Sequence, residues 1–423
     1  MITQQIDAVA AEDIVESLRN GIPPKRFASS YSAGNEEFLR EVRKRHLESL
    51  STRGKIRFIS GSWGAGKTHF LRILREQAFE AGHLVSTVEL SADQTPLHKF
   101  EQVFFDIIRN ITSPEMYREG DLARAAPFSE VLRRALFRDA TGPEDSIDHE
   151  RLQEAKQALF NSDGIDIDLR RIVAHYWETF LPEGGDPVTL EDTRGRILQW
   201  FAGEGTVGSY RSQFGVQKIV TRANARLMLQ SLSRLVTHIG YRGLLILLDE
   251  AEHSFSTMRK SNLKQAHNNL LHLINGIDKS DGLFLVYAAI PDFYIDDQHG
   301  ITIYGALAQR IGRPENRPPL ALDKVWNLDA VGTSLDDFLA ASSKIRQISL
   351  LARPDLEETV PSEEALRKCV ADLVKVHPEF SPVSTWRVVV TGTVAVLDAA
   401  ERGEQIQPSE QLHEDIMQRA REQ

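Results

Sequence analysis

The stretch RFISGSWGAGKTHFLRIL, residues 57–74, constrains the fold more than any other part of the chain. An apolar run typical of a strand leads into a glycine-rich loop, GSWGAGKT, and a pattern of helical period begins directly after the loop. A loop of this pattern, between a strand and a helix, cradles phosphates in nucleotide-binding α/β proteins. The next run, HLVSTVELS, is typical of a second strand. The region therefore predicts an α/β fold with a parallel sheet and helices packed on it.

The predicted phosphate loop contains the groups that bind a nucleoside triphosphate. Its glycines allow backbone N–H groups to point into one concavity, which side chains would otherwise block. Lys67 would reach the terminal phosphates, the Thr68 hydroxyl would hold Mg²⁺, and the helix that begins here adds its positive end. We therefore predict ATP and Mg²⁺ as cofactors. The predicted nucleotide-binding residues are Gly61, Ser62, Trp63, Gly64, Ala65, Gly66, Lys67, Thr68 and His69.

A second motif, LLILLDE, is an unbroken apolar run that ends in two carboxylates, Asp249 and Glu250. Such a run is typical of a buried strand in a parallel sheet. Ligands of open α/β sheets bind at the carboxyl ends of the strands, where these side chains would lie. We expect Asp249 to hold Mg²⁺ through water and Glu250 to polarise the attacking water. Together with the phosphate loop, the pair predicts an ATPase that cleaves the phosphoanhydride bond.

The charge of the chain limits its partners. A net charge of −10 over 423 residues argues against a surface dominated by nucleic acid, which requires a cationic footprint. The basic run REVRKRH, residues 40–46, leaves DNA binding through a local patch open. Its alternation with apolar positions is more typical of the solvated side of a helix.

Cysteine usage and hydropathy point to a cytoplasmic protein. The one cysteine, Cys369, excludes a disulfide framework and a zinc site built from cysteines. No apolar run approaches the roughly 18 residues that span a bilayer. The start, MITQQIDAVAAEDIVESL, carries acids where a signal peptide carries bases. We expect no membrane segment.

The patterns along the chain predict five segments. Residues 1–30 form an N-terminal helix and connector, 31–111 the first part of the core, 112–220 a helical insertion, 221–315 the second part of the core with two strands, and 316–423 a C-terminal helical lid.

This order of parts resembles the AAA+ and related STAND ATPases. The phrases SGSWGAGKTHFLRIL, TPLHKFEQVF, WFAGEG, GYRGLLILLDEAEH and YGALAQRI resemble the BREX ATP-binding family of BrxC/BrxD-type proteins, BrxD most closely, over residues 18–397. The resemblance implies an AAA+-like core and an ATPase of a bacterial phage-defence system. It also implies homo-oligomers and partners from the same locus, such as a helicase, a methyltransferase or a phosphatase-like protein.

In addition to Lys67 and Glu250, the resemblance implies catalytic arginines. Arg310, in ALAQRIGRPE, stands where a neighbouring subunit's finger is expected, with Arg313 as a weaker candidate. Arg387 resembles the second sensor on a lid helix. Such arginines stabilise charge on the transferring phosphoryl group. Each is also compatible with a solvated surface position.

The strand GLFLVYAAI departs from the family pattern, because it should end in a polar residue that orients water. Ala288, Ala289 and Ile290 stand there instead, so hydrolysis would be slow or Asp292 would substitute. Two alternatives therefore stay open: a nucleotide-gated scaffold with little hydrolysis, and a P-loop kinase. His253, directly after DEAE, is more typical of a surface histidine at a helix start than of a phosphate contact.

Overall fold

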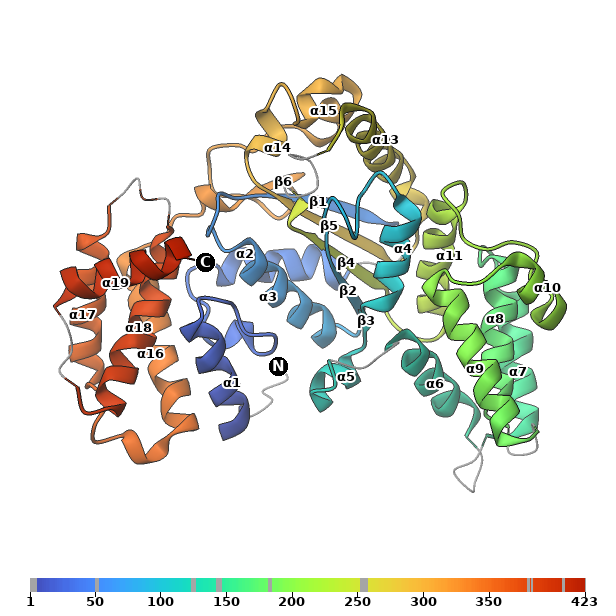
Figure 1. Cartoon of the computed structure of the whole chain (residues 1–423), viewed down its shortest axis with the longest axis horizontal. Coiled ribbons are helices and arrows are strands. Elements are labelled where there is room, and N and C mark those ends of the chain that lie inside the picture. Colours follow the sequence, from blue (N-terminus) through green and yellow to red (C-terminus); the bar gives the residue numbers. More distant parts are fainter. Residues whose placement is uncertain are drawn as a thin grey trace. The chain divides into compact units, whose positions relative to one another are not determined.

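The computed structural model describes residues 6–49, 53–122, 127–141, 147–181, 185–251, 258–378, 381, 383–404 and 408–422. Helices and strands are mixed along the chain, as Figure 1 shows. This mixture confirms the predicted α/β class.

Six strands of the described residues form one sheet in the order β3-β2-β4-β5-β1-β6. They are β1 (Lys55–Ser60), β2 (Leu84–Glu89), β3 (Ile111–Thr112), β4 (Leu244–Asp249), β5 (Leu283–Ala289) and β6 (Val325–Asn327). β2, β4 and β5 pair in parallel, with Leu84 opposite Leu244 and Leu244 opposite Leu283. Every residue of β4 and β5 is buried, which explains their unbroken apolar runs. The parallel sheet was predicted correctly.

Two strands were missed in the sequence. β3 pairs with β2 in the antiparallel direction, and β6 lies in the part after residue 316, for which a mainly helical lid was expected. They are two and three residues long. Runs this short show no alternation of apolar and polar residues, so pattern alone does not reveal them.

The chain forms two compact units, each assembled from separate segments. The first unit comprises Met1–Lys44, Ile59–Gln77 and Arg313–Gln423. The second unit comprises Arg45–Phe58 and Ala78–Gly312.

The helical part of the first unit is a bundle, in which α16 to α19 pack on one another and α1 packs on α16 and α18 (Figure 1). The helices are α1 (Ala8–Arg19), η1 (Ala28–Ser30), α2 (Glu36–Val42), η5 (Leu328–Ala330), α16 (Leu335–Ala352), η6 (Pro354–Leu356), α17 (Glu363–Val376), α18 (Thr385–Glu401) and α19 (Ser409–Glu422). Two further helices contain residues of both units: the π-helical turn η2 (Arg43–Leu47) and α3 (Lys67–Glu80).

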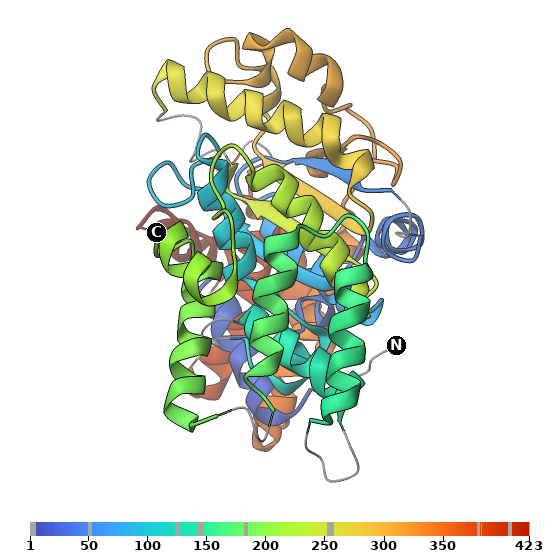
Figure 2. The same ribbon diagram turned by 90° about the vertical axis from the view of Figure 1, so that its right-hand side faces the viewer.

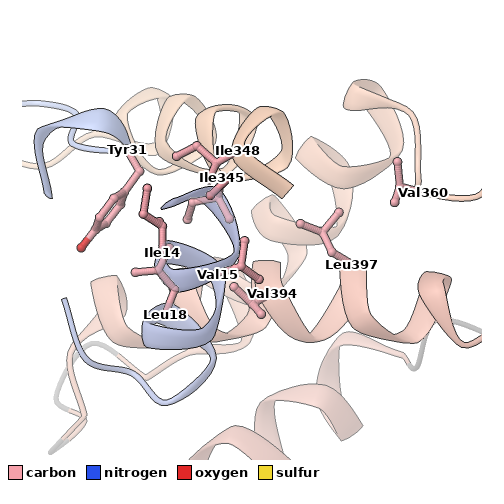
Figure 3. Packing of buried hydrophobic residues seen from close by; sticks show 10 residues of the cluster. Ile14, Val15, Leu18, Tyr31, Ile345, Ile348, Val360, Val394 and Leu397 are labelled. Atoms are coloured by element: carbon pink, nitrogen blue, oxygen red, sulfur yellow. The ribbon is translucent and has the colours of Figure 1, made fainter. Parts of the chain in front are cut away.

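The hydrophobic core of this bundle contains side chains from α1 and from the C-terminal helices α16 and α18. Ile14 and Leu18 are four residues apart and therefore share one face of α1. They pack with Ile345 of α16 and with Val394 and Leu397 of α18, as Figure 3 shows. Burying such side chains contributes about 1.5–3 kcal/mol each.

Polar contacts at its two ends also hold α1. Asp7 is the N-cap and accepts a hydrogen bond from the Ala10 N–H at 2.8 Å. At the other end Arg19 donates to both carboxylate oxygens of Asp398, at 2.8 and 3.0 Å. This paired geometry is more specific than a single ion contact.

The second unit contains the paired strands β2 to β5 and the helices around them. Its helices are α4 (Phe100–Arg109), α5 (Pro114–Glu119), α6 (Pro127–Ala140), α7 (His149–Asn161), α8 (Ile167–Glu178), α9 (Pro187–Ala202), α10 (Val207–Phe214), α11 (Ala225–His238), α13 (Lys260–Gly276), η3 (Ile277–Lys279), α14 (Asp292–Ile295), η4 (Ile301–Ile303) and α15 (Gly305–Ile311). Between β3 and β4 only helices occur among the described elements. α7, α8 and α9 stand side by side in Figure 2, where they are green.

None of the helices in the described residues is long and apolar enough to cross a membrane.

His83, between α3 and β2, makes the stability of the second unit depend on pH. It is fully buried, with Nε2 2.9 Å from the Leu47 carbonyl oxygen. Burial lowers the pKa of His83 from 6.5 to about 4. In the unfolded chain His83 is protonated below pH 6.5, whereas in the folded chain it stays neutral down to about pH 4. The free energy of unfolding therefore falls as the pH decreases from 6.5 to about 4.

We expect this histidine to lower the free energy of unfolding by about 2 kcal/mol at pH 5 relative to pH 7. His83→Gln keeps an N–H donor but does not titrate. Its melting temperature should therefore change less between pH 7 and pH 5 than that of the wild type. An equal change in both proteins would show that His83 does not contribute.

Candidate functional site

The predicted phosphate loop follows β1 and leads into α3, which begins at Lys67, one residue before the predicted start. Gly64 and Gly66 have φ angles of 77° and 87°, in the left-handed region that disfavours side chains. A Cβ on Gly64 would also lie 2.9 Å from the Ser384 hydroxyl oxygen. The Ala65 N–H donates to the Ser62 carbonyl oxygen at 3.1 Å and closes the turn. The glycines are therefore required by backbone conformation and by close approach.

Lys67 turns back over the loop. Its side chain is buried, and Nζ donates to the carbonyl oxygens of Gly61 at 2.9 Å and Ser62 at 3.3 Å. Nζ also lies 5.5 Å from the centroid of the Trp63 indole, which is 56% exposed. A cation at this distance is attracted to the face of the ring. The ammonium group is thus held against the carbonyl oxygens at the start of the loop.

The next two predicted residues lie in the first turn of α3. Thr68 is partly buried. The Tyr31 hydroxyl and His69 Nδ1 are 2.9 Å apart, and burial lowers the pKa of His69 to about 4. Because its imidazole is neutral and engaged with Tyr31, His69 would contribute its backbone N–H to a nucleotide.

A carboxylate that was not predicted also contacts the loop. Asp329, in η5, accepts the backbone N–H of Ser62 at 2.9 Å and its hydroxyl at 2.9 Å. Sequence analysis missed this residue, although VWNLD repeats the signal of LLILLD, an acid soon after an apolar strand.

The first turn of α18 also lies beside the loop. Its N-cap, Ser384, accepts the N–H of Arg387 at 3.3 Å and stands against Gly64. The Arg387 side chain is half-buried and packs over Gly21, where a Cβ would be 3.2 Å from Nε. The first unit thus brings together the phosphate loop, Asp329 and the helix that carries the predicted lid arginine.

The predicted acidic pair occupies the carboxyl end of β4 in the second unit. Asp249 is 4% exposed, and its Oδ1 accepts the Glu250 N–H at 3.0 Å. On the neighbouring strand, the exposed Glu89 stands opposite Asp249 in the pairing register. Three carboxylates therefore lie at this edge, of which Glu89 was not predicted.

Glu250 has a φ angle of 54°, in the left-handed region that residues other than glycine rarely adopt. Such a conformation costs about 1–2 kcal/mol. The side chain of Glu250 is exposed, whereas those of Asp249 and Ala251 on either side are buried. The strained backbone turns this one carboxylate out of the strand toward solvent, where a catalytic carboxylate would be needed.

The neighbouring strand β5 ends in apolar residues. Ala288 and Ala289 are fully buried, and Ile290 is partly buried. Asp292, the predicted substitute, is exposed in the first turn of α14.

Arg310 lies in the last turn of α15 with its side chain exposed, and Arg313 is exposed two residues beyond the helix. Tyr304, at the start of α15, donates to Asn268 Oδ1 of α13 at 3.2 Å and fixes the helix there. His253 lies outside the described residues.

Few protein groups would be available to hold the predicted Mg²⁺. Within the described ranges, no group of three or more His, Cys, Asp or Glu side chains could hold a metal ion. The predicted ligands are the Thr68 hydroxyl and the buried Asp249 carboxylate. Both are oxygen donors, and Mg²⁺ bound with a nucleotide takes only one or two protein oxygens beside phosphates and water. The donor chemistry therefore fits Mg²⁺.

The sequence model of the family described as BREX system ATP-binding protein BrxC/D matches residues 6–416, nearly the whole chain. The chain belongs to this family. No curated protein sequence and no solved structure matches it.

Membership in the BREX ATP-binding family confirms the resemblance inferred from the sequence phrases. The chain is thereby an ATP-binding component of a BREX defence system. ATP fits the loop described above, because left-handed glycines, a helix start and the buried Lys67 supply the N–H groups and the positive charge that a polyphosphate requires.

Proposed function

We propose that this BREX protein is an AAA+-like ATPase that hydrolyses ATP and acts as a nucleotide-driven switch or loader for partner proteins. The observation that carries the proposal is the phosphate loop, in which Gly64 and Gly66 adopt left-handed conformations and Lys67 is held beside them at the start of α3.

Each predicted residue has a defined task in hydrolysis. Lys67 would compensate the negative charge of the terminal phosphates. Thr68 directly and Asp249 through water would hold Mg²⁺, which would neutralise further charge. Glu250 orients a water molecule and accepts its proton as the water oxygen attacks the γ-phosphorus. The bond between the γ-phosphorus and the bridging oxygen breaks, and the products are ADP and inorganic phosphate.

Two arginines would complete the site. Arg387 is supported by its place in the first turn of α18, whose N-cap stands against Gly64 of the loop. Arg310 is supported by its exposure at the end of α15, where a neighbouring copy could reach it. We propose Arg387 as the lid sensor and Arg310 as a finger that acts in a homo-oligomer.

Partners of the enzyme would come from the same defence locus, such as a helicase, a methyltransferase or a phosphatase-like protein. DNA is a further candidate partner, through the basic run at residues 40–46. Arg40, Lys44 and Arg45 of this run are exposed, whereas His46 is buried. Three cations would supply part of a phosphate contact surface and not a complete footprint.

Because β5 ends in apolar residues, a second function stays open: a nucleotide-gated scaffold that binds ATP and hydrolyses little of it. Without a polar side chain at Ile290, the attacking water has one fewer orienting group, so turnover would be slow. A kinase would instead need an acceptor that takes the phosphoryl group. Assay of the products separates these readings: free phosphate supports hydrolysis, a labelled acceptor supports a kinase, and bound ATP without products supports a scaffold.

The oligomeric site predicts complementation between two inactive variants. The wild-type chain should be a weak ATPase whose specific activity rises with protein concentration. Arg310→Ala and Lys67→Ala should each be inactive, and their mixture should recover part of the activity. One type of mixed interface joins an intact finger to an intact phosphate loop. Phosphate release is measured together with particle size.

The control is a mixture of each variant with the double variant. Neither mixture can form an intact site, because every phosphate loop lacks Lys67 in the first and every finger lacks Arg310 in the second. Both control mixtures should therefore stay inactive. If the two single variants form mixed oligomers and stay inactive, Arg310 does not act across an interface and the ring arrangement is wrong.

A further inference from the structure

The carboxylate of Asp329 holds the second residue of the phosphate loop. Ser62 donates its backbone N–H to both carboxylate oxygens, at 3.1 and 2.9 Å, and its hydroxyl to one of them at 2.9 Å. The two residues are 267 positions apart in the chain. The Ser62 carbonyl oxygen in turn accepts the Ala65 N–H and Lys67 Nζ. Asp329 is therefore linked through Ser62 to the turn of the loop and to the ammonium group of Lys67.

The backbone on the N-terminal side of Asp329 packs against the phosphate loop and α3. Trp326 in β6 is fully buried, and its ring centroid lies 5.9 Å from that of Phe70 in α3. Leu328 is buried against the start of the loop, with its Cβ 3.5 Å from where a Cβ on Gly61 would stand. Because both neighbours are packed, the Asp329 carboxylate is presented to Ser62 by a fixed backbone and not by a mobile surface loop.

A carboxylate at this place has two opposed effects on an anionic ligand. Its hydrogen bonds keep Ser62 in one conformation, which lowers the ordering cost that ATP binding would otherwise carry. Its charge repels the phosphates. Because Asp329 is exposed, the repulsion is screened by salt, whereas the hydrogen-bond geometry is not.

We propose that Asp329 is a positioning residue that holds the phosphate loop ready for ATP and, through its charge, keeps the affinity for ATP below the value that the loop would otherwise reach. This inference rests on the proposed nucleotide-binding function of the loop.

The test compares Asp329→Asn with Asp329→Ala in the full chain. Both variants remove the charge, but asparagine keeps a carbonyl oxygen that can accept the Ser62 N–H. At low salt we expect Asp329→Asn to bind a fluorescent ATP analogue about threefold more tightly than the wild type. Asp329→Ala should bind about tenfold more weakly than Asp329→Asn, because the loop must be ordered on binding.

Two controls separate the effects. Asp336→Asn removes one charge from an exposed position in the first turn of α16 and should leave the affinity close to that of the wild type. Lys67→Ala should lose binding, which shows that the measured site is the phosphate loop. Melting temperatures without nucleotide confirm that all variants are folded.

The inference is overturned if Asp329→Asn and Asp329→Ala bind equally well while binding still depends on Lys67. It is also overturned if the gain of Asp329→Asn persists at 500 mM salt, since a screened charge effect should fade. If Lys67→Ala binds as well as the wild type, the proposed nucleotide site itself is wrong, and the inference falls with it.

Discussion

Lys67→Ala is expected to abolish ATP binding, with the affinity lower by a factor on the order of 100 or more. The ammonium group is buried and held at the carbonyl oxygens of Gly61 and Ser62. It can therefore reach a polyphosphate on the loop with only a small change of side-chain conformation. Removal leaves the terminal phosphates without this charge partner. Equilibrium titration of the purified chain with a fluorescent ATP analogue measures the loss.

Two controls make the Lys67 result specific. Lys368→Ala removes an exposed lysine of α17 and should not change the affinity. Lys67→Arg keeps the charge, but its planar guanidinium is larger than the ammonium group and differs in donor geometry, so binding should still be impaired. Wild-type affinity in Lys67→Ala would show that the loop does not bind the nucleotide.

Glu250→Gln is expected to retain ATP binding and to lose hydrolysis by about 10²–10⁴-fold. Glutamine has nearly the same shape as glutamate, but its amide cannot accept a proton from the attacking water. The backbone at Glu250 has a φ angle of 54° in either case, so the substitution changes the chemistry and not the strain. Phosphate release and ATP binding are measured on the same samples.

Glu89→Gln is the matched control for this experiment. Glu89 is an exposed carboxylate opposite Asp249 in the pairing register, so its replacement removes the same charge from the same edge of the sheet. We expect a change of no more than about threefold. If Glu250→Gln turned over at the wild-type rate, or if both variants lost activity equally, Glu250 would not be the base.

The strands and the loop could be predicted because their signals are local. The runs of β4 and β5 are apolar throughout because every residue in them is buried. Gly64 and Gly66 stand where the backbone takes left-handed φ angles, so the requirement of the turn is recorded in the residue type. The family match over residues 6–416 supports the same interpretation independently of the fold.

Other features could not be predicted because they depend on partners far apart in the chain. The contact between Ser62 and Asp329 joins two residues 267 positions apart, and neither has a sequence signal that names the other. Ser384 could be expected to cap a helix but not to stand against Gly64. The strained conformation of Glu250 is also invisible in the letters LLILLDE, since glutamate rarely adopts it.

The sequence by itself determined the α/β class, the phosphate loop and the family, because hydrophobic period, glycine positions and the acidic strand end are properties of short segments. The tertiary structure alone decided which groups surround that loop: Asp329 at Ser62, Ser384 at Gly64 and Tyr31 at His69. The physical reason is that these contacts form only when separate segments pack together, as Trp326 of β6 and Phe70 of α3 do beside the loop.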